Sequence, residues 1–258
     1  MQIAFVTYPG MTALDMVGPY EVMRSLPGAE VRFVWHKPGP ITTDSGVLIL
    51  GATHSFAETP RPDIVLVPGS SNATSSTACD RQLLAWLQEV HPGTQWTASV
   101  CSGSVILAAA GVLHGRKATT HWRAMNLLKL FGVEPDPDSR IVQDGKIVTA
   151  AGVSAGFDLA LFMAAKIAGP AYAQALQLVL EYDPRPLFDS GHIKKASART
   201  KITANGIMTK QGMLKPTEIL GTTRLLWDAT LTRARRRNKG PRHGSPSVGS
   251  AAPNHYAR

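Results

Sequence analysis

Cys101 lies where a short β-rich segment gives way to a helix of small residues, in the stretch QWTASVCSGSVILAAAGVL (95–113). The strand-like residues end just before the cysteine and the helical pattern starts at Ser102, so Cys101 falls on the turn between them. Ser99 and Gly103, two residues away on either side, leave room for a sharp turn. This arrangement is similar to a nucleophile elbow, although the G-x-S-x-G pattern itself is absent.

A thiol at the start of a helix has distinctive chemistry. It faces unpaired backbone N–H groups and the positive end of the helix dipole, both of which favour the thiolate. The same N–H groups can stabilise negative charge that develops on a substrate. We therefore predict that Cys101 is an activated nucleophile. The alternative is a small residue that is simply buried at a junction.

Asp15 is a lone carboxylate among Leu14, Met16 and Val17, shortly after the first strand-like segment. Residues that follow parallel strands project over one edge of the sheet, so Asp15 is expected near Cys101. An acid in apolar surroundings tends to have a raised pKa and can hold or exchange a proton. Asp15 is accordingly a candidate proton-transfer partner, with a helix-start cap as the alternative.

Two further motifs follow strand-like segments at the same predicted edge. In DIVLVPGSSN, Gly69 and Ser70 form a turn whose backbone N–H groups would face the pocket, unless the turn is only a connection. In KATTHW, His121 follows a short β-like run and suggests a Cys-His pair, or else a hydrogen-bonded structural histidine. Both motifs extend the predicted site beyond Cys101 and Asp15.

The cysteine count and the N-terminal sequence indicate a cytoplasmic protein. Cys79 and Cys101 are the two cysteines of the chain, too few for a disulfide framework or a cysteine-rich zinc site. Cys79, in SSTACDRQLL, has no strand before it, and we expect no catalytic role for it. The opening MQIAFVTYPG is unlike a secretory signal, and no apolar run is long enough to span a bilayer.

Short apolar, β-branched segments alternate with longer helical patterns along most of the chain. Strands that are apolar throughout, separated by helices, predict a doubly wound α/β fold with a mainly parallel sheet covered on both faces. Functional sites in such folds gather at the carboxyl ends of the strands. The predicted strands are 2–7, 31–35, 63–68, 96–100 and 147–150, and the predicted helices are 12–26, 81–90, 102–110, 122–131, 154–168 and 170–181.

The formal net charge of +9 is concentrated in the C-terminal part of the chain. Residues 1–185 carry 13 Lys and Arg against 15 Asp and Glu, whereas residues 186–258 carry 14 against 3. We predict one domain over 1–188 and a basic extension over 189–258, helical over 216–237 and disordered from about 239. Such an extension attracts polyanions without specificity, so nucleic acid is not expected as a specific partner.

Four blocks of the sequence, in this order, resemble the ThiJ/PfpI superfamily, whose fold is a class I glutamine-amidotransferase-like, flavodoxin-type sandwich. They are LDMVGPYEV, DIVLVPGS, SVCSGSVILAAAGVLHGRKATTHW and VTAAGVSAGFDLALFMAAKIAG. Within that superfamily, ALDMVGPYEV, the block around Cys101 and EYDPRPLFDSG look most like isonitrile hydratases, which are carbon-oxygen hydro-lyases. The resemblance implies a small-molecule isonitrile substrate, a homodimer, and neither a metal nor an organic cofactor.

The resemblance also implies a reaction, the addition of water to an isonitrile to give an N-substituted formamide. Carried onto matching positions, Cys101 would attack the terminal isonitrile carbon and form a thioimidate, an electrophile suited to a soft thiolate. Asp15 would protonate that carbon or activate the water, and Ser102 would hold the reacting groups. The pocket and oxyanion residues would be Gly69, Ser70 and Gly103, with His121 behind the reacting groups.

Two positions depart from the expected hydratase pattern. Ser102 stands where threonine is expected, and Gly69-Ser70 replaces the usual glycine pair after the third strand. Both changes are small, and both lie where they would alter the fit of a substrate rather than the presence of the nucleophile.

Two alternative functions remain compatible with the sequence. Many relatives carry an AraC-type helix-turn-helix region and act as transcription regulators, and the basic extension favours that class; such a region needs about 100 residues with two helix-turn-helix units. The other alternative is a glyoxalase- or deglycase-like enzyme that acts on α-oxoaldehydes. In those enzymes the carboxylate beside the cysteine is normally glutamate, whereas Asp15 is shorter.

Overall fold

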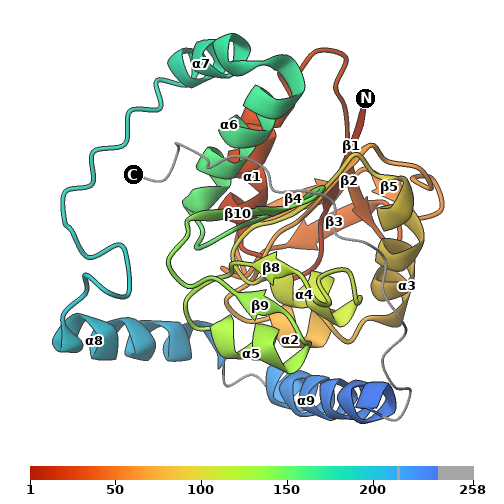
Figure 1. The fold of residues 1–258 in the computed structure, drawn as a ribbon, viewed down its shortest axis with the longest axis vertical. Coiled ribbons are helices and arrows are strands. Elements are labelled where there is room, and N and C mark those ends of the chain that lie inside the picture. Colours follow the sequence, from red (N-terminus) through yellow and green to blue (C-terminus); the bar gives the residue numbers. More distant parts are fainter. Residues whose placement is uncertain (214–215, 238–258) are drawn as a thin grey trace.

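A seven-stranded sheet runs through the molecule, with α1 (Ala13–Met23) and α6 (Ala155–Ala168) against one face and α3 (Arg81–Val90) and α4 (Gly103–Ala109) against the other (Figure 1). The computed structural model describes residues 1–213 and 216–237. The predicted disorder from about 239 therefore falls outside the described residues. The doubly wound α/β fold expected from the sequence is confirmed.

The five predicted strands form the centre of this sheet. The strand order is β10-β11-β7-β6-β1-β2-β5, and every pair is parallel except the antiparallel β10–β11 pair at one edge. All four residues of β6 and of β11 are buried, as expected for strands covered on both faces. The strands are β1 (Gln2–Val6), β2 (Glu30–Trp35), β5 (His54–Ser55), β6 (Ile64–Val67), β7 (Trp96–Ser99), β10 (Ile141–Asp144) and β11 (Ile147–Ala150).

Two small strand pairs were not predicted. The hairpin of β3 (Gly39–Thr42) and β4 (Ile49–Ala52) extends from the sheet, and its exposed residues and Pro40 hide it from an apolar-pattern search. The pair β8 (Lys117–Ala118) and β9 (Glu134–Pro135) is only two residues long. Both pairs prove important, because the segments beside them form part of the cavity wall described below.

The six helices predicted before residue 182 are present, although several are shorter at their ends. In α3, the Asp80 side chain caps the helix by accepting a hydrogen bond from the Leu83 N–H at 2.9 Å. The helices not predicted are α2 (Thr74–Thr77), too short to show a periodic pattern, and α8 (Ala198–Met208), which has no buried face. The remaining predicted helices are α5 (Met125–Leu130) and α7 (Pro170–Val179).

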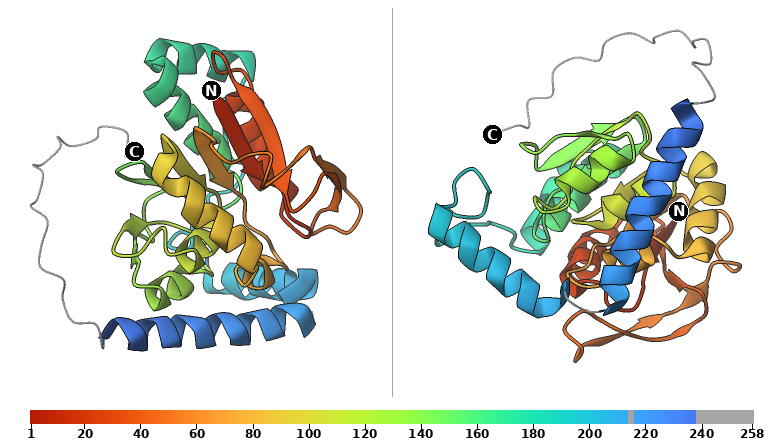
Figure 2. Two further views of the ribbon diagram at one scale, coloured as in Figure 1. Left: turned by 90° about the vertical axis from the view of Figure 1, so that its right-hand side faces the viewer. Right: turned by 90° about the horizontal axis from the view of Figure 1, so that it is seen from below.

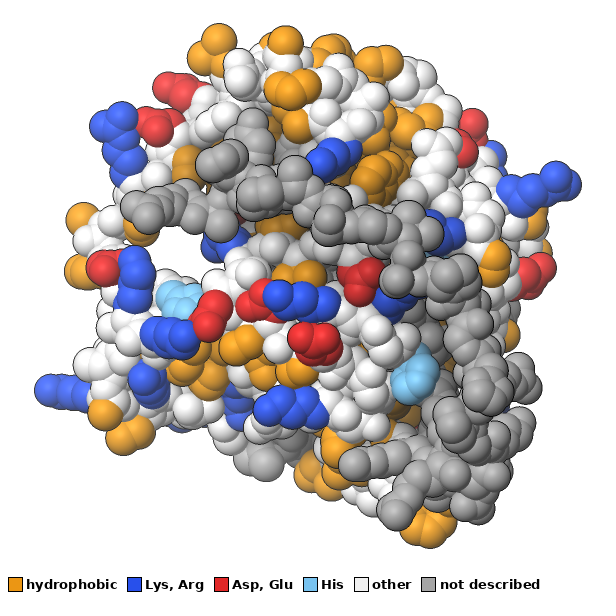
Figure 3. Space-filling view, in the orientation of Figure 1, with side chains coloured by type: hydrophobic (Ala, Val, Ile, Leu, Met, Phe, Trp, Pro, Cys, Tyr) orange, Lys and Arg blue, Asp and Glu red, His pale blue; other side chains and the backbone are white. Residues whose placement is uncertain are grey.

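The C-terminal extension first leaves the domain and then returns to it. After α7 the chain runs outward to α8, passes through a π-turn at Thr209–Met213, and returns as α9 (Pro216–Arg237), the helix predicted over 216–237. Figure 2 shows α9 lying across the lower side of the domain, where it packs on α2 and α5. Lys and Arg side chains gather over α8 in the space-filling view of Figure 3. No helix among residues 1–213 and 216–237 is long and apolar enough to cross a membrane.

Candidate active site

The turn at Cys101 is strained. Its φ of +56° lies in the left-handed region, which costs an L-residue roughly 1–2 kcal/mol. The surroundings hold the turn in place, because the Cys101 carbonyl accepts hydrogen bonds from Thr120 Oγ1 at 2.9 Å and from Ser104 Oγ at 3.3 Å. The strand β7 ends at Ser99 and α4 begins at Gly103, so the structure contains the strand-turn-helix elbow that the sequence predicts.

Gly103 is needed for close packing. A Cβ at this position would lie 2.1 Å from the Val67 carbonyl oxygen, so only glycine lets α4 approach the end of β6. The Gly103 N–H donates to the Val100 carbonyl at 3.0 Å. Its donor thus has an acceptor in this conformation, and a contribution of Gly103 to an oxyanion site stays a prediction.

Asp15 lies in the first turn of α1 and is fully buried. Its Oδ2 accepts a hydrogen bond from the Gly69 N–H at 2.9 Å, and its Oδ1 has no hydrogen-bond partner among the described residues. Burial raises the pKa of the Asp15 carboxyl to about 7, against the opposing effects of the Gly69 N–H and the adjacent Cys101 thiol. Asp15 thus has the raised pKa expected of a group that exchanges protons near neutral pH.

Burial opposes ionisation of Cys101. Burial, followed by the negative charge of Asp15, raises the pKa of the Cys101 thiol well above its usual value. The Ser102 N–H acts in the opposite direction. The start of the helix therefore does not by itself determine the pKa of the thiol, and the activation of Cys101 as a nucleophile stays a prediction. The Asp15 carboxyl is the adjacent group that could accept the thiol proton.

The amides of Gly69 and Ser70 position side chains instead of facing the cavity. The Gly69 N–H is bound to Asp15, and the Ser70 N–H donates to Ser102 Oγ at 3.0 Å. Ser102 Oγ also lies 2.6 Å from Thr74 Oγ1. Both donors have partners in this conformation, and the expectation that these two amides form an oxyanion site stays a prediction. Ser70 still lines the cavity through its own atoms.

Space at Gly69 is as restricted as space at Gly103. A Cβ on Gly69 would lie 2.5 Å from the Ser102 backbone nitrogen and 2.9 Å from Asp15 Oδ2. The turn after β6 therefore brings the α1 carboxylate and the start of α4 together only because it carries no side chain.

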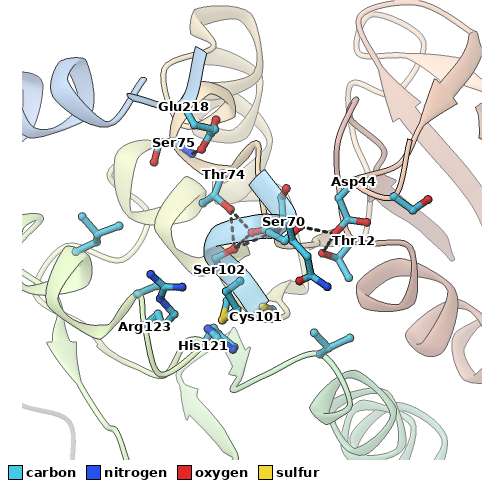
Figure 4. Close-up of a pocket in the computed structure, with 17 residues that line it drawn as sticks. Thr12, Asp44, Ser70, Thr74, Ser75, Cys101, Ser102, His121, Arg123 and Glu218 are labelled. Atoms are coloured by element: carbon cyan, nitrogen blue, oxygen red, sulfur yellow. Dashed lines mark hydrogen bonds between the residues drawn. The ribbon is translucent and has the colours of Figure 1, made fainter. Parts of the chain in front are cut away.

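His121 lies on the wall of the same cavity as Cys101 (Figure 4). Burial and the positive charge of Arg123 lower the pKa of His121 to about 4, so the ring is neutral at physiological pH. No hydrogen bond joins it to Cys101 within the described part of the chain, and the Cys-His pair considered from the sequence is not formed. Cys79 lies away from this cavity, where its thiol is 3.6 Å from the Gly221 carbonyl of α9.

A cavity of about 690 Å³ opens in front of Cys101. Much of its wall comes from segments that sequence reasoning did not select. Asp44, in the loop between β3 and β4, accepts hydrogen bonds from Thr12 Oγ1 at 2.6 Å and from Ser71 Oγ at 2.9 Å. The cavity-lining residues that were not predicted include Thr12, Asp44, Ser71, Thr74, Arg123, Gln211 and Glu218.

Glu218, in the C-terminal extension, forms part of the cavity wall. Although it belongs to α9, its carboxylate is buried and accepts hydrogen bonds from the backbone N–H of Ser75 and of Ser76 at 3.2 and 3.0 Å. The Ser76 hydroxyl donates to it as well. Gly221, one turn further on, lies so close to α2 that a Cβ there would be 2.7 Å from the Ser76 nitrogen. The last described helix is therefore docked at the cavity by specific contacts.

Comparisons with known proteins identify the family of this chain. A model of the DJ-1/PfpI family matches residues 1–166. The chain belongs to the DJ-1/PfpI family. Its resemblance to the ThiJ/PfpI superfamily, stated from the sequence blocks, is thereby confirmed.

Named relatives within the DJ-1/PfpI family include an enzyme and a regulator. The chain is 41% identical over 191 residues to an isonitrile hydratase of Pseudomonas putida, a match that covers 74% of this chain and 82% of that protein. It is 27% identical over 179 residues to the HTH-type transcriptional regulator CdhR of Pseudomonas aeruginosa, covering 66% of this chain and 51% of the regulator. A crystal structure of a ThiJ/PfpI family protein from Pseudomonas syringae matches with a TM-score of 0.76 and 38% identity, covering 85% of this chain and 90% of that one.

Replacement of Asp15 by Asn should remove the part of the pH dependence of stability that the Asp15 carboxyl causes. The carboxyl has a pKa of 3.8 as its reference value and about 7 when folded, so the folded state holds the proton more tightly between these pH values. The contribution of Asp15 to stability should therefore fall as pH rises from about 4 to about 7, by on the order of 4 kcal/mol. The measurement is urea unfolding of wild type and Asp15→Asn across this range.

His121 also contributes to the pH dependence of stability, and it does so equally in wild type and in Asp15→Asn. Because its pKa is lowered in the folded state, its contribution to stability rises with pH through roughly the same range. The difference between the two curves isolates Asp15. Parallel curves would show that Asp15 is not a buried acid with a raised pKa.

Replacement of Glu218 by Ala should loosen α9 from the domain. The substitution leaves the Ser75 and Ser76 N–H groups without their carboxylate partner, and hydrogen bonds to a charged group contribute about 1.5–3 kcal/mol each. We expect faster amide hydrogen exchange over 216–231 and in α2. Asp228→Ala, on the exposed side of the same helix, is the matched control and should exchange like wild type. Equal exchange in all three proteins would contradict the docking role.

Proposed function

We propose that this protein catalyses the cysteine-dependent hydration of an isonitrile to an N-substituted formamide, through a thioimidate and without a cofactor. The observation that carries the proposal is the buried pair of Asp15, with a pKa of about 7, and the Cys101 thiol at the wall of a cavity. The 41% identity to an isonitrile hydratase over most of both chains supports the substrate class.

The first step forms a carbon–sulfur bond. As the Cys101 sulfur attacks the terminal isonitrile carbon, its proton passes to Asp15, whose pKa near neutrality lets it accept the proton and return it. Asp15 then gives the proton to the same carbon. The product of this step is a thioimidate in which the former isonitrile carbon carries one hydrogen, one sulfur and a double bond to nitrogen. The low polarity around Asp15 favours a mechanism that passes through neutral species.

The second step consumes water. Water adds to the thioimidate carbon, and one of its protons passes by way of Asp15 to the substrate nitrogen. The carbon–sulfur bond then breaks, the remaining hydroxyl proton returns to the sulfur, and the formamide leaves. Ser102 positions this centre, because its hydroxyl ties together the Ser70 amide and Thr74 and its N–H faces Cys101. The sum of the two steps is one isonitrile and one water in, one formamide out.

Cys101→Ala should abolish formamide production, and Asp15→Asn should lower it by about 100-fold or more, the usual contribution of a positioned acid–base group. The assay follows the ultraviolet absorbance of the formamide made from cyclohexyl or p-nitrophenyl isocyanide. Cys79→Ala is the matched control, because that thiol lies away from the cavity, and it should keep wild-type activity. Activity in Cys101→Ala would disprove the nucleophile, and mass spectrometry of wild-type protein quenched during turnover should detect a thioimidate adduct on Cys101.

The same set of proteins separates the two alternative functions. Turnover of methylglyoxal with no turnover of either isonitrile would place the reaction with the α-oxoaldehyde enzymes and leave the Cys101 site intact. Sequence-selective DNA binding that weakens with salt would favour a regulator. The described part of the extension contains α8 and α9, which is less than the two helix-turn-helix units of an AraC-type region. We therefore place the hydratase first.

We further propose that the protein is a cytoplasmic homodimer whose subunits meet through α7, the following segment and α8. Leu178, Val179, Leu187, Phe188 and Ile202 are each at least 74% exposed, an unusual amount of apolar surface for one stretch of chain. Cys79 and Cys101 are both free thiols, which suits a reducing compartment.

Replacement of Leu187 and Phe188 by Glu together should shift the protein from dimer to monomer. Charges at these positions oppose burial against a second copy. Sedimentation velocity over a range of concentrations measures the change, and Val47→Glu, an equally exposed residue in the β3–β4 loop, is the control. A wild-type protein that sediments as a monomer would contradict the dimer.

A further inference from the structure

Arg123 contributes a half-buried cationic group to the cavity wall. Its guanidinium lines the cavity, and Nη1 is buried without a hydrogen-bond partner in residues 1–213 and 216–237. It also forms no ion pair with the described carboxylates. A guanidinium stays charged at all relevant pH values and carries five N–H donors, so leaving a buried donor unpaired is costly. The arrangement suits a ligand that supplies the missing acceptor.

The two carboxylates on the cavity wall already have partners. Asp44 accepts from Thr12 and Ser71, and Glu218 accepts from the backbone and side chain at the start of α2. These contacts direct both carboxylates towards their own donors. Among the described residues that line the cavity, Arg123 is thus the charged residue whose hydrogen-bond donors are not already used by a partner.

The position of Arg123 defines where an anion would bind. It follows β8, two residues after His121, and its charge is close enough to lower the pKa of that ring. Figure 4 shows Arg123, His121 and Cys101 on one side of the cavity, with Asp44 on the opposite side. An acceptor bound to Arg123 would therefore lie in the same cavity as an atom attacked by Cys101, on the same side of it.

We propose that Arg123 binds a carboxylate on the substrate, so that the isonitriles hydrated by this protein carry an acidic group close to the isonitrile carbon. A carboxylate matches the planar guanidinium and can accept two parallel hydrogen bonds from it. It would pair with the donors of the guanidinium that face the cavity and fix the orientation of the reactive carbon in front of Cys101. This inference rests on the proposed function for the identity of the reacting group, and on Arg123 for the acid.

The test compares isocyanoacetate with its neutral methyl ester in wild type, Arg123→Gln and Arg123→Lys. The ratio of kcat/KM for the acid over kcat/KM for the ester should fall by about tenfold or more in Arg123→Gln, mainly through KM for the acid, since a charge-assisted hydrogen bond is lost. Arg123→Lys should recover part of the ratio. Arg116→Gln, which removes an exposed arginine paired with Asp144, is the matched control and should keep the wild-type ratio. An unchanged ratio in Arg123→Gln would overturn the inference.

A binding measurement separates this inference from the proposed reaction. Calorimetry of N-formylglycine and its methyl ester is carried out on Cys101→Ala and on Cys101→Ala with Arg123→Gln, after thermal unfolding has shown that both proteins are folded. Tighter binding of the acid in the first protein, lost in the second, supports the carboxylate site even if neither isonitrile is turned over. Turnover of both isonitriles without any such difference in binding would retain the hydratase and refute the carboxylate site.

Discussion

One hydrogen bond, from the Gly69 amide to the Asp15 carboxyl, determines how the rest of the site is arranged. It joins the turn after β6 to the first turn of α1. The absence of a side chain at Gly69 lets Ser102, at the start of α4, pack against the same turn. Burial of Asp15 outweighs the opposing effects of the Gly69 N–H and the Cys101 thiol, which keeps its pKa near 7. The pKa of the Cys101 thiol is raised as well, because the same burial and the same carboxyl act on it. The raised pKa values of both groups thus result from the packing that buries them.

The sequence was sufficient for the parts of the molecule that are governed by local pattern. Apolar strands showed the central sheet, and the small residues around Cys101 showed the elbow, because burial on both faces and a sharp turn each leave a local signature. Asp15 was found because a lone acid in an apolar stretch is unusual. The sequence indicated that Gly103 leaves room at the turn. It could not show that the Gly103 N–H donates to the Val100 carbonyl.

Long-range polar contacts left no such signature. Asp44 lies in a hairpin of half-exposed residues, Arg123 belongs to no recognisable motif, and Glu218 sits in a helix of the basic extension. The amides of Gly69 and Ser70 could be placed near the site from sequence, but only the structure shows that Asp15 and Ser102 already occupy them. Charge balance alone described 189–258 as an appendage, whereas the buried carboxylate of Glu218 makes part of it a structural element of the cavity.

The docking of α9 also has a consequence for the order in which the protein becomes complete during synthesis. Asp15, Gly69 and Cys101 belong to the first part of the chain to leave the ribosome, and they contact one another without the extension. Glu218 arrives last and closes its contact with α2 only then. Because domains fold as their residues emerge, the nascent chain can carry an assembled thiol–carboxyl pair before its substrate cavity has a finished wall.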